Sequence, residues 1–182
     1  MRTRPTKADL DAARTKTVRD VIGPGLDVLF CGINPGLYTA AIGHHFGKPG
    51  NRFWPALHLS GFTPREISPY DESELLALGL GITNVVMRTT AAAAELTDDE
   101  LRAGAAALRK KVLRHKPRYL AVLGLGAYRV GFGIKQAAVG PQPERIGVTK
   151  VWLLPNPSGL NAHYQLPDLA REFGRLRAVS LE

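Results

Sequence analysis

Two asparagine–proline turns are the residues of this chain best suited to do chemistry. Asn34 lies in GINPG (32–36) and Asn156 in PNPSGL (155–160), and each turn follows a continuous apolar run. An asparagine amide is no general base, because it does not titrate in water, but it both donates and accepts hydrogen bonds. The proline that follows fixes its own φ and favours an extended asparagine. We expect each turn to be a rigid bracket for a polar ligand or a water, the alternative being a plain turn.

The second turn carries two further side chains of interest. Ser158 supplies a hydroxyl two residues after Asn156, and Leu160 follows Gly159 in an expected surface loop. An exposed apolar tip is typical of a side chain that inserts into a partner, or of an interface. The alternative is a leucine that folds back onto the core.

The segment GHHFGKPGNRFW (43–54) offers ligand contacts but no metal site. His44 and His45 point apart in an extended segment, and no third ligand at metal spacing accompanies them, so we expect no zinc. One of the two histidines is a candidate ligand contact. Phe46, beside a glycine, suits stacking on a nucleic-acid base, with core packing as the alternative. Arg52 has two open roles, which are to hold a loop or to bind a phosphate.

Four continuous apolar runs predict the strands that position these residues, namely Leu26–Ile33, Gly81–Val86, Tyr119–Leu123 and Val151–Leu154. Continuous runs are typical of strands buried on both faces, as in a parallel sheet. Helical patterns span Asn51–Leu59, Thr97–His115 and Pro167–Ala178. We therefore expect an α/β fold, a three-layer α/β/α sandwich around a short, mainly four-stranded parallel sheet. Ligands bind beyond the carboxyl ends of such strands, where both Asn-Pro turns fall.

The second predicted helix explains a cluster of acids without catalysis. Thr97 precedes Glu100 by three residues, which is the spacing of a capping box, and Asp98 and Asp99 then lie in the first turn, where the helix dipole favours negative charge. The basic residues between Arg102 and Arg118 fill the later turns. They form either a solvated helix face or a contact to DNA phosphates.

The composition favours one domain with a polyanionic partner. The chain has 182 residues, 45% of them hydrophobic, which suits a single domain at 23–182 preceded by a basic arm or helix at 1–22. A net charge of +8 and a sequence pI near 9.9 favour nucleic acid as the partner. The single cysteine excludes a disulfide framework.

Several classes of protein are not expected. No apolar run reaches the ~20 residues of a membrane span, and residues 1–20 lack the apolar core of a signal peptide. GxGxxG and GxxxxGK[ST] fingerprints are missing, so we expect no nucleotide cofactor and no metal. The expectation is a cytoplasmic, nucleoid-associated protein that acts as a monomer.

Three motifs together resemble a known family. GINPG (32–36), GNRFW (50–54) and NPSGL (156–160) resemble the mismatch-specific uracil-DNA glycosylases, the bacterial branch of the family that includes thymine-DNA glycosylase. The resemblance runs from about Leu26 to Arg177. GHHFGKPGN is closer to the thymine-DNA glycosylase branch, and NPSGL is closer to the bacterial branch.

The resemblance implies roles for the candidate residues. Asn34 would position the attacking water, and Phe46 would stack on the flipped pyrimidine. Asn156 and Ser158 would occupy the motif in which stronger uracil glycosylases place a histidine. The other implied base-binding residues are Ile33, Gly36, His45 and Thr89.

The same resemblance implies a DNA wedge. Gly159, Leu160 and Asn161 would fill the gap left by the flipped base and contact the opposite guanine in double-stranded DNA that contains a mismatched uracil. Asn161 and Ala162 depart from the serine and arginine typical of the bacterial branch.

With these implied roles, the resemblance predicts a monofunctional glycosylase. In such an enzyme uracil would be flipped out of the duplex, and the glycosidic bond would then break through an oxocarbenium-like sugar. The motif around Asn34 holds no obvious carboxylate base, so we expect release to depend on the leaving group and uracil to leave faster than thymine. A carboxylate outside the motif that activates the water is the open alternative. Three alternatives stay open: a non-catalytic lesion binder, a glycosylase for single-stranded or non-mismatched uracil, and a nucleoside hydrolase on a flavodoxin-like sandwich.

Overall fold

The computed structural model describes residues 3–181; residues 1 and 2 of the expected arm and residue 182 of the expected domain lie outside that range. A five-stranded sheet forms its centre, in the order β2-β1-β3-β5-β4. Its strands are β1 (Val28–Gly32), β2 (Leu80–Asn84), β3 (Tyr119–Leu123), β4 (Gly140–Ile146) and β5 (Thr149–Leu154). Pairings among β2, β1, β3 and β5 are all parallel. The four predicted strands are therefore confirmed.

The sequence did not predict the fifth strand. β4 pairs antiparallel with β5 at the edge of the sheet, with an irregular register between Pro141 and Arg145. Its sequence, GPQPERI, carries two prolines, which argue against a strand anywhere but at an edge. Alternate residues of β4 are exposed, as an edge position allows.

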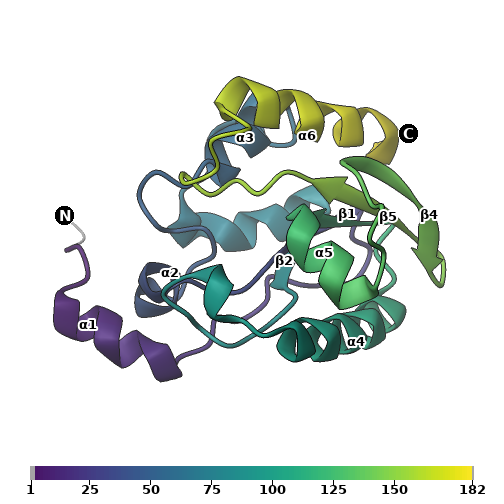
Figure 1. The fold of residues 1–182 in the computed structure, drawn as a ribbon. Coiled ribbons are helices and arrows are strands. Elements are labelled where there is room, and N and C mark those ends of the chain that lie inside the picture. Colours follow the sequence, from purple (N-terminus) through teal and green to yellow (C-terminus); the bar gives the residue numbers. More distant parts are fainter. Residues whose placement is uncertain (1–2, 182) are drawn as a thin grey trace.

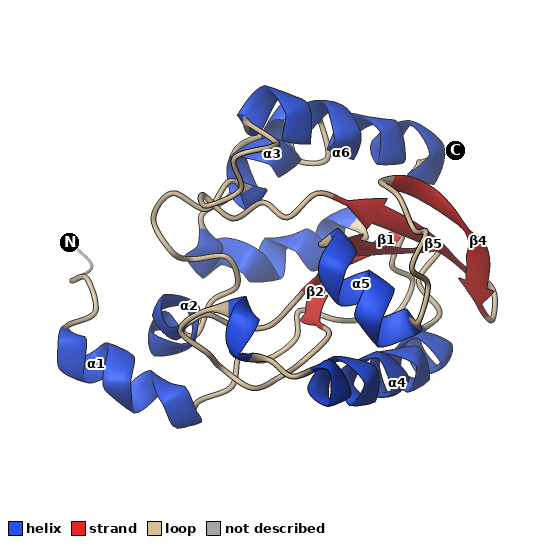
Figure 2. Ribbon diagram, viewed as in Figure 1, coloured by secondary structure: helices blue, strands red, loops and turns tan. Residues whose placement is uncertain are grey.

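Helices cover both faces of the sheet and form the outer layers of the sandwich (Figures 1 and 2). α3 (Phe53–Leu59) and α6 (Leu166–Ser180) lie on one face. α4 (Asp98–His115) and α5 (Leu125–Phe132) lie on the other. A hydrophobic core fills each interface, one around Phe30 and Phe173 and one around Leu29 and Tyr128. The predicted three-layer α/β/α architecture is confirmed.

The predicted helices appear within a few residues of their expected bounds as α3, α4 and α6. The capping box of α4 is present, because the Thr97 hydroxyl accepts from the Glu100 N–H and the Glu100 side chain accepts from the Thr97 N–H. The sequence did not predict α2 (Leu37–Ile42) or α5, which are short and rich in small residues. Three 3-10 helices complete the connections, at Ala13–Thr15, Pro69–Leu78 and Ala93–Glu95.

The N-terminal segment contains α1 (Lys7–Ala12), and the residues that follow α1 contact the sheet and α4. Val21 forms an antiparallel bridge with Ile82 of β2. Asp20 forms an ion pair with Lys111 of α4 at 2.5 Å and accepts from the Thr83 hydroxyl at 2.8 Å. The residues just before position 22 are thus packed against the sheet and α4.

The strand order determines where a ligand site can form. From β1 the chain passes to β2 on one side and later to β3 on the other, so the connections diverge at the carboxyl ends of β1 and β3. Such a switch point leaves a crevice between the loops. Within the described residues, no helix is long and apolar enough to cross a membrane.

Candidate active site

A cleft of about 460 Å³ opens at this edge of the sheet. Residues at or just after the ends of β1, β2, β3 and β5 line it, namely Asn34, Asn84, Leu123 and Asn156. The site residues predicted from the sequence that line it are Ile33, Asn34, Gly36, His45, Phe46, Asn156, Ser158, Leu160 and Asn161. Two predicted residues, Thr89 and Gly159, do not line the cleft.

The Asn34 amide is held in one orientation. Its Nδ2 donates to the backbone oxygen of Arg88 at 2.9 Å and to Thr90 Oγ1 at 2.8 Å. Because a backbone carbonyl can only accept, the amide nitrogen must lie on that side. No other described residue donates to Asn34 Oδ1, so this oxygen remains an available acceptor on a residue that lines the cleft.

The Asn156 amide is fixed in the complementary sense. Its Oδ1 accepts from the backbone N–H of Ser158 at 2.9 Å, and the Ser158 hydroxyl in turn accepts from the N–H of Leu160 at 3.2 Å. Because a backbone N–H can only donate, the oxygen of Asn156 lies in the turn and its Nδ2 lies on the other side. The two Asn-Pro turns therefore offer the cleft an acceptor from Asn34 and a donor from Asn156.

Phe46 forms an aromatic wall of the cleft and also packs on the core. Its ring stacks on Phe53, with centroids 4.1 Å apart and 26° between the planes. Its backbone is left-handed, with φ at 52°, which is uncommon for a residue other than glycine. A Cβ at Gly32 would lie 3.2 Å from Phe46 Cζ and 2.5 Å from Asn84 Oδ1. A glycine at the end of β1 thus lets the ring and the Asn84 amide approach.

Asn84 is a cleft residue that sequence reasoning missed. It is the last residue of β2, is 5% exposed, and its amide lies against the end of β1. The apolar run continues through Val85 and Val86, which are also buried, so the end of the strand was not visible in the pattern. The signal that the sequence did offer is a polar amide inside the apolar run Gly81–Val86.

His45 is a neutral, enclosed residue at the back of the cleft. It is 1% exposed, and its Nε2 lies 2.8 Å from the backbone oxygen of Arg19, so Nε2 carries the proton and donates. Its Nδ1 lies 3.5 Å from Asn84 Nδ2, which it faces as an acceptor. Burial lowers the pKa of His45 and keeps the ring uncharged at neutral pH, although Glu72 acts in the opposite direction.

Thr89 faces away from the cleft and its neighbour faces into it. The Thr89 hydroxyl donates to the backbone oxygen of Lys16 at 2.6 Å, which ties the N-terminal segment to this loop. Thr90 lines the cleft, bonds Asn34 Nδ2 through its hydroxyl, and donates its N–H to the oxygen of Pro35 at 3.1 Å. The sequence therefore pointed to the residue next to the threonine that lines the cleft, and the role of Thr89 in base binding stays a prediction.

The loop after β5 projects Leu160 into solvent. This leucine is 87% exposed and does not fold back onto the core. Asn161 bonds the backbone oxygen of Asn156 through its Nδ2 at 2.9 Å, which closes the loop on itself. Arg52 donates to Ser158 O and Asn161 O of this loop, so of its two expected roles it fulfils that of holding a loop.

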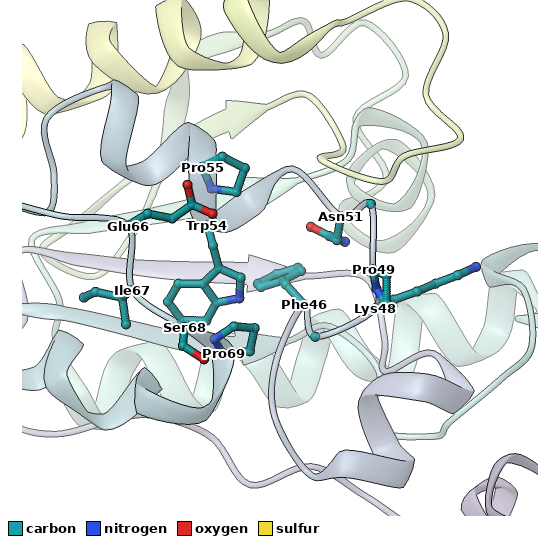
Figure 3. Close-up of a pocket in the computed structure, with 12 residues that line it drawn as sticks. Phe46, Lys48, Pro49, Asn51, Trp54, Pro55, Glu66, Ile67, Ser68 and Pro69 are labelled. Atoms are coloured by element: carbon teal, nitrogen blue, oxygen red, sulfur yellow. The ribbon is translucent and has the colours of Figure 1, made fainter. Parts of the chain in front are cut away.

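A second, shallower pocket of about 400 Å³ adjoins the cleft and shares Phe46, Lys48 and Asn51 with it (Figure 3). Its other walls include Trp54 and prolines, and none of the polar residues that follow the strands lines it. Figure 3 shows the Lys48 side chain extending away from the Phe46 and Trp54 rings. Lys48 thus presents a cation beside the cleft.

The cleft holds polar but no acidic side chains. None of the described residues that line it is aspartate or glutamate. Within residues 3–181, no group of three or more His, Cys, Asp or Glu side chains is placed to hold a metal ion. The described lining residues therefore offer hydrogen bonding by amides, hydroxyls and backbone, the imidazole of His45, the ammonium of Lys48 and one aromatic face.

Comparison with known protein families agrees with this geometry. A family model for the Uracil DNA glycosylase superfamily matches residues 20–176. The match includes all five strands, helices α2 to α5 and most of α6, together with every residue that lines the cleft. The chain therefore belongs to the uracil DNA glycosylase superfamily.

Proposed function

We propose that this protein flips uracil out of mismatched double-stranded DNA, with a preference for G·U, and releases it by hydrolysis to leave an abasic site. Family membership supports action on uracil in DNA. The pair of fixed amides carries the proposal, because Asn34 offers an acceptor and Asn156 a donor to one cleft. We also propose that it acts as a monomer, in the cytoplasm close to the nucleoid.

The flipped pyrimidine would lie against Phe46 and the Asn84 amide. A base must leave the stack before its glycosidic bond can be reached, which costs a few kcal/mol and less for a mismatched base. Leu160, exposed at the mouth of the cleft, would occupy the vacated place in the duplex. The lower cost of extruding a mismatched base supports the proposed preference for G·U over A·U.

Asn34 would hold the attacking water through Oδ1. The C1′–N1 bond breaks as an oxocarbenium-like sugar forms, and the electron pair leaves with the base as an anion. Water oxygen then bonds to C1′, and the proton that it loses balances the charge of the base. Asn156 Nδ2 would donate to the developing anion, and stabilisation of charge at that point favours the transition state.

The absence of an acidic group among the lining residues supports a dependence on the leaving group. Without a carboxylate to activate water, the barrier is set largely by how well the base carries negative charge. We propose that uracil and pyrimidines with electron-withdrawing substituents leave faster than thymine. We propose base release without strand cleavage, since Lys48 extends away from the Phe46 ring and would instead contact a phosphate.

A substrate panel tests the proposed preference. Labelled duplexes with G·U, A·U or G·T, and single strands with U, would be incubated without added metal and then treated with alkali to reveal abasic sites. We expect release in the order G·U, A·U, G·T, and no breaks without alkali. Equal rates on G·U and single-stranded U would contradict the mismatch preference, and binding without release from any substrate would favour a lesion binder.

A further inference from the structure

Arg52 connects the two loops that form the mouth of the cleft. It lies at the start of α3, and its backbone N–H donates to the oxygen of Pro157 at 2.9 Å. Its guanidinium donates to three backbone oxygens of the loop between β5 and α6. These are the oxygens of Ser158, Asn161 and Tyr164, at 2.5, 2.8 and 2.6 Å. One side chain thus gathers carbonyls that the chain itself leaves without partners in a helix or strand.

The arrangement uses features specific to arginine. Several carbonyl oxygens converge on one point, and their negative ends would repel one another without a cation between them. The planar fork of a guanidinium can donate to all of them at once, whereas a lysine ammonium cannot reproduce that geometry. None of the ion pairs found among residues 3–181 includes Arg52, so its charge serves these carbonyls.

The same two loops touch at a second point. A Cβ at Gly159 would lie 2.8 Å from the backbone oxygen of Gly50, which is closer than a side chain tolerates. The loop that bears Leu160 is therefore held against the 47–52 segment by the Arg52 hydrogen bonds and by direct backbone contact at Gly159. Leu160 itself is exposed and has no packing of its own to fix it.

We propose that Arg52 is a positioning residue for base flipping, which holds the 156–165 loop rigid so that Leu160 can fill the stack after the base leaves. This inference rests on the proposed function. The bases of a duplex tend to restack and to expel an inserted side chain. Leu160 therefore stays inserted only if the loop that carries it is rigid. A single strand has no stack to fill, and release from it does not need the wedge.

The test compares Arg52→Lys with wild type on two substrates under single-turnover conditions, a G·U duplex and a uracil single strand. We expect the loss on the duplex to exceed the loss on the single strand by a factor on the order of 10², as small misplacements near a reacting centre can produce. Arg65→Lys is the matched control, because Arg65 pairs with Glu74 on the exposed surface and should leave both rates unchanged.

Two further variants keep the test decisive. Gly159→Ala forces the loops apart while Arg52 remains, and Leu160→Ala removes the wedge from an intact loop; both should repeat the duplex-specific loss. The fluorescence of 2-aminopurine placed beside the uracil reports unstacking without chemistry, and its rise should shrink in all three variants. If single strands are poor substrates, the 2-aminopurine signal tests the positioning role of Arg52. If Arg52→Lys does not fold, Gly159→Ala tests it.

The outcomes separate the inference from the function on which it rests. Equal losses on duplex and single strand, or an unchanged 2-aminopurine signal in Arg52→Lys and Gly159→Ala, would overturn the positioning role while leaving the glycosylase intact. Wild-type protein that releases no uracil from any substrate would instead overturn the proposed function, and the inference with it.

Discussion

At the scale of single residues, the site depends on groups whose orientation a neighbour dictates. The Asn34 amide is turned by the Arg88 carbonyl, and the Asn156 amide by the Ser158 N–H. Neither arrangement needs a charged side chain, so the amides are set before a ligand arrives. Gly32 adds the space that this requires, since any side chain there would meet Asn84 and Phe46.

Gly32→Ala should therefore close the cleft without unfolding the protein. The added methyl would lie 2.5 Å from Asn84 Oδ1 and 3.2 Å from Phe46 Cζ, so the amide and ring must shift. We expect uracil release to fall by roughly 10²-fold, the scale of a small misplacement at a reacting centre. Single-turnover release and a thermal melt would be measured together.

Gly174→Ala is the control for this change. Gly174 lies in α6, where an added Cβ meets nothing within 4 Å. It should keep full activity and gain up to about 1 kcal/mol of stability from the better helix former. A Gly32→Ala protein that is as active as Gly174→Ala would contradict the role given to the end of β1.

The sequence predicted part of this site for a physical reason. Asn34 follows an apolar run directly, Asn156 follows one after Pro155, and each precedes a proline. The rule that ligands bind beyond strand ends therefore selected both. Asn84 was missed because the residues after it are apolar and buried as well. The choice between Thr89 and Thr90 depends on which of two adjacent side chains faces the cleft, and composition carries no such information.

At the scale of elements, helix α4 links its own start to the cleft. Glu100, in its first turn, closes the capping box on Thr97 and also accepts from Arg88 Nε at 2.6 Å. The backbone oxygen of Arg88 is the partner of Asn34. A local capping signal that the sequence reveals thus also steadies the loop that orients a catalytic candidate.

This contact predicts a particular pH dependence of stability. The hydrogen bond from Arg88, then that from the Thr97 N–H, lowers the pKa of Glu100 to about 2. A lowered folded-state pKa contributes stability above the unfolded value of about 4.3, and that contribution is lost as the pH falls toward about 2. Glu100→Gln should be less stable than wild type at pH 7, and the gap should narrow below about pH 4.

Urea denaturation of both proteins at several pH values between 7 and 3 would measure that gap. Glu74→Gln provides a comparison, because Glu74 pairs with Arg65 on the exposed surface and caps no helix. A gap between wild type and Glu100→Gln that stays constant across the series would mean that the Glu100 charge is not what stabilises this helix start.

The sequence pattern does not predict two further elements, β4 and α5. β4 has alternate residues exposed and two prolines, so neither continuity nor propensity indicates a strand, and only pairing with β5 makes it one. α5 begins after Gly124 with LGAYRVGF, whose glycines disfavour a helix. Its packing against α4, where Gly131 approaches Leu101 O, supplies what local preference lacks.

At the scale of the whole molecule, part of the positive charge lies far from the cleft. α4 runs from the cleft edge, where Glu100 meets Arg88, to the opposite edge, where Arg118 pairs with Asp27 at the start of β1. The basic end of α4 therefore lies away from the cleft. Of the two roles open to it from the sequence, the position favours a solvated face.

DNA affinity should accordingly depend on Lys48 and not on the basic end of α4. Lys48→Ala removes a cation beside the cleft, and we expect weaker binding to every duplex and a log Kd–log salt slope reduced by about one. The double variant Lys110→Ala, Arg114→Ala removes two exposed charges at the far edge. It should leave both affinity and slope unchanged.

Fluorescence anisotropy with a labelled G·U duplex across a salt series would measure the DNA affinity and the salt slope of wild type and both variants. If the double variant lost affinity and lowered the slope by about two, the far edge would be part of the DNA contact and the duplex would have to extend around the molecule.

The central claim is that the Asn34 bracket holds the water that releases uracil, and single-turnover release from a G·U duplex tests it most directly. Free uracil would be quantified by mass spectrometry for wild type and Asn34→Ala, with binding of both proteins to the same duplex measured alongside. We expect wild type to release uracil and Asn34→Ala to lose at least about 10²-fold in rate, while its DNA affinity is retained. Undiminished release by Asn34→Ala would contradict the claim and show that another group positions the water.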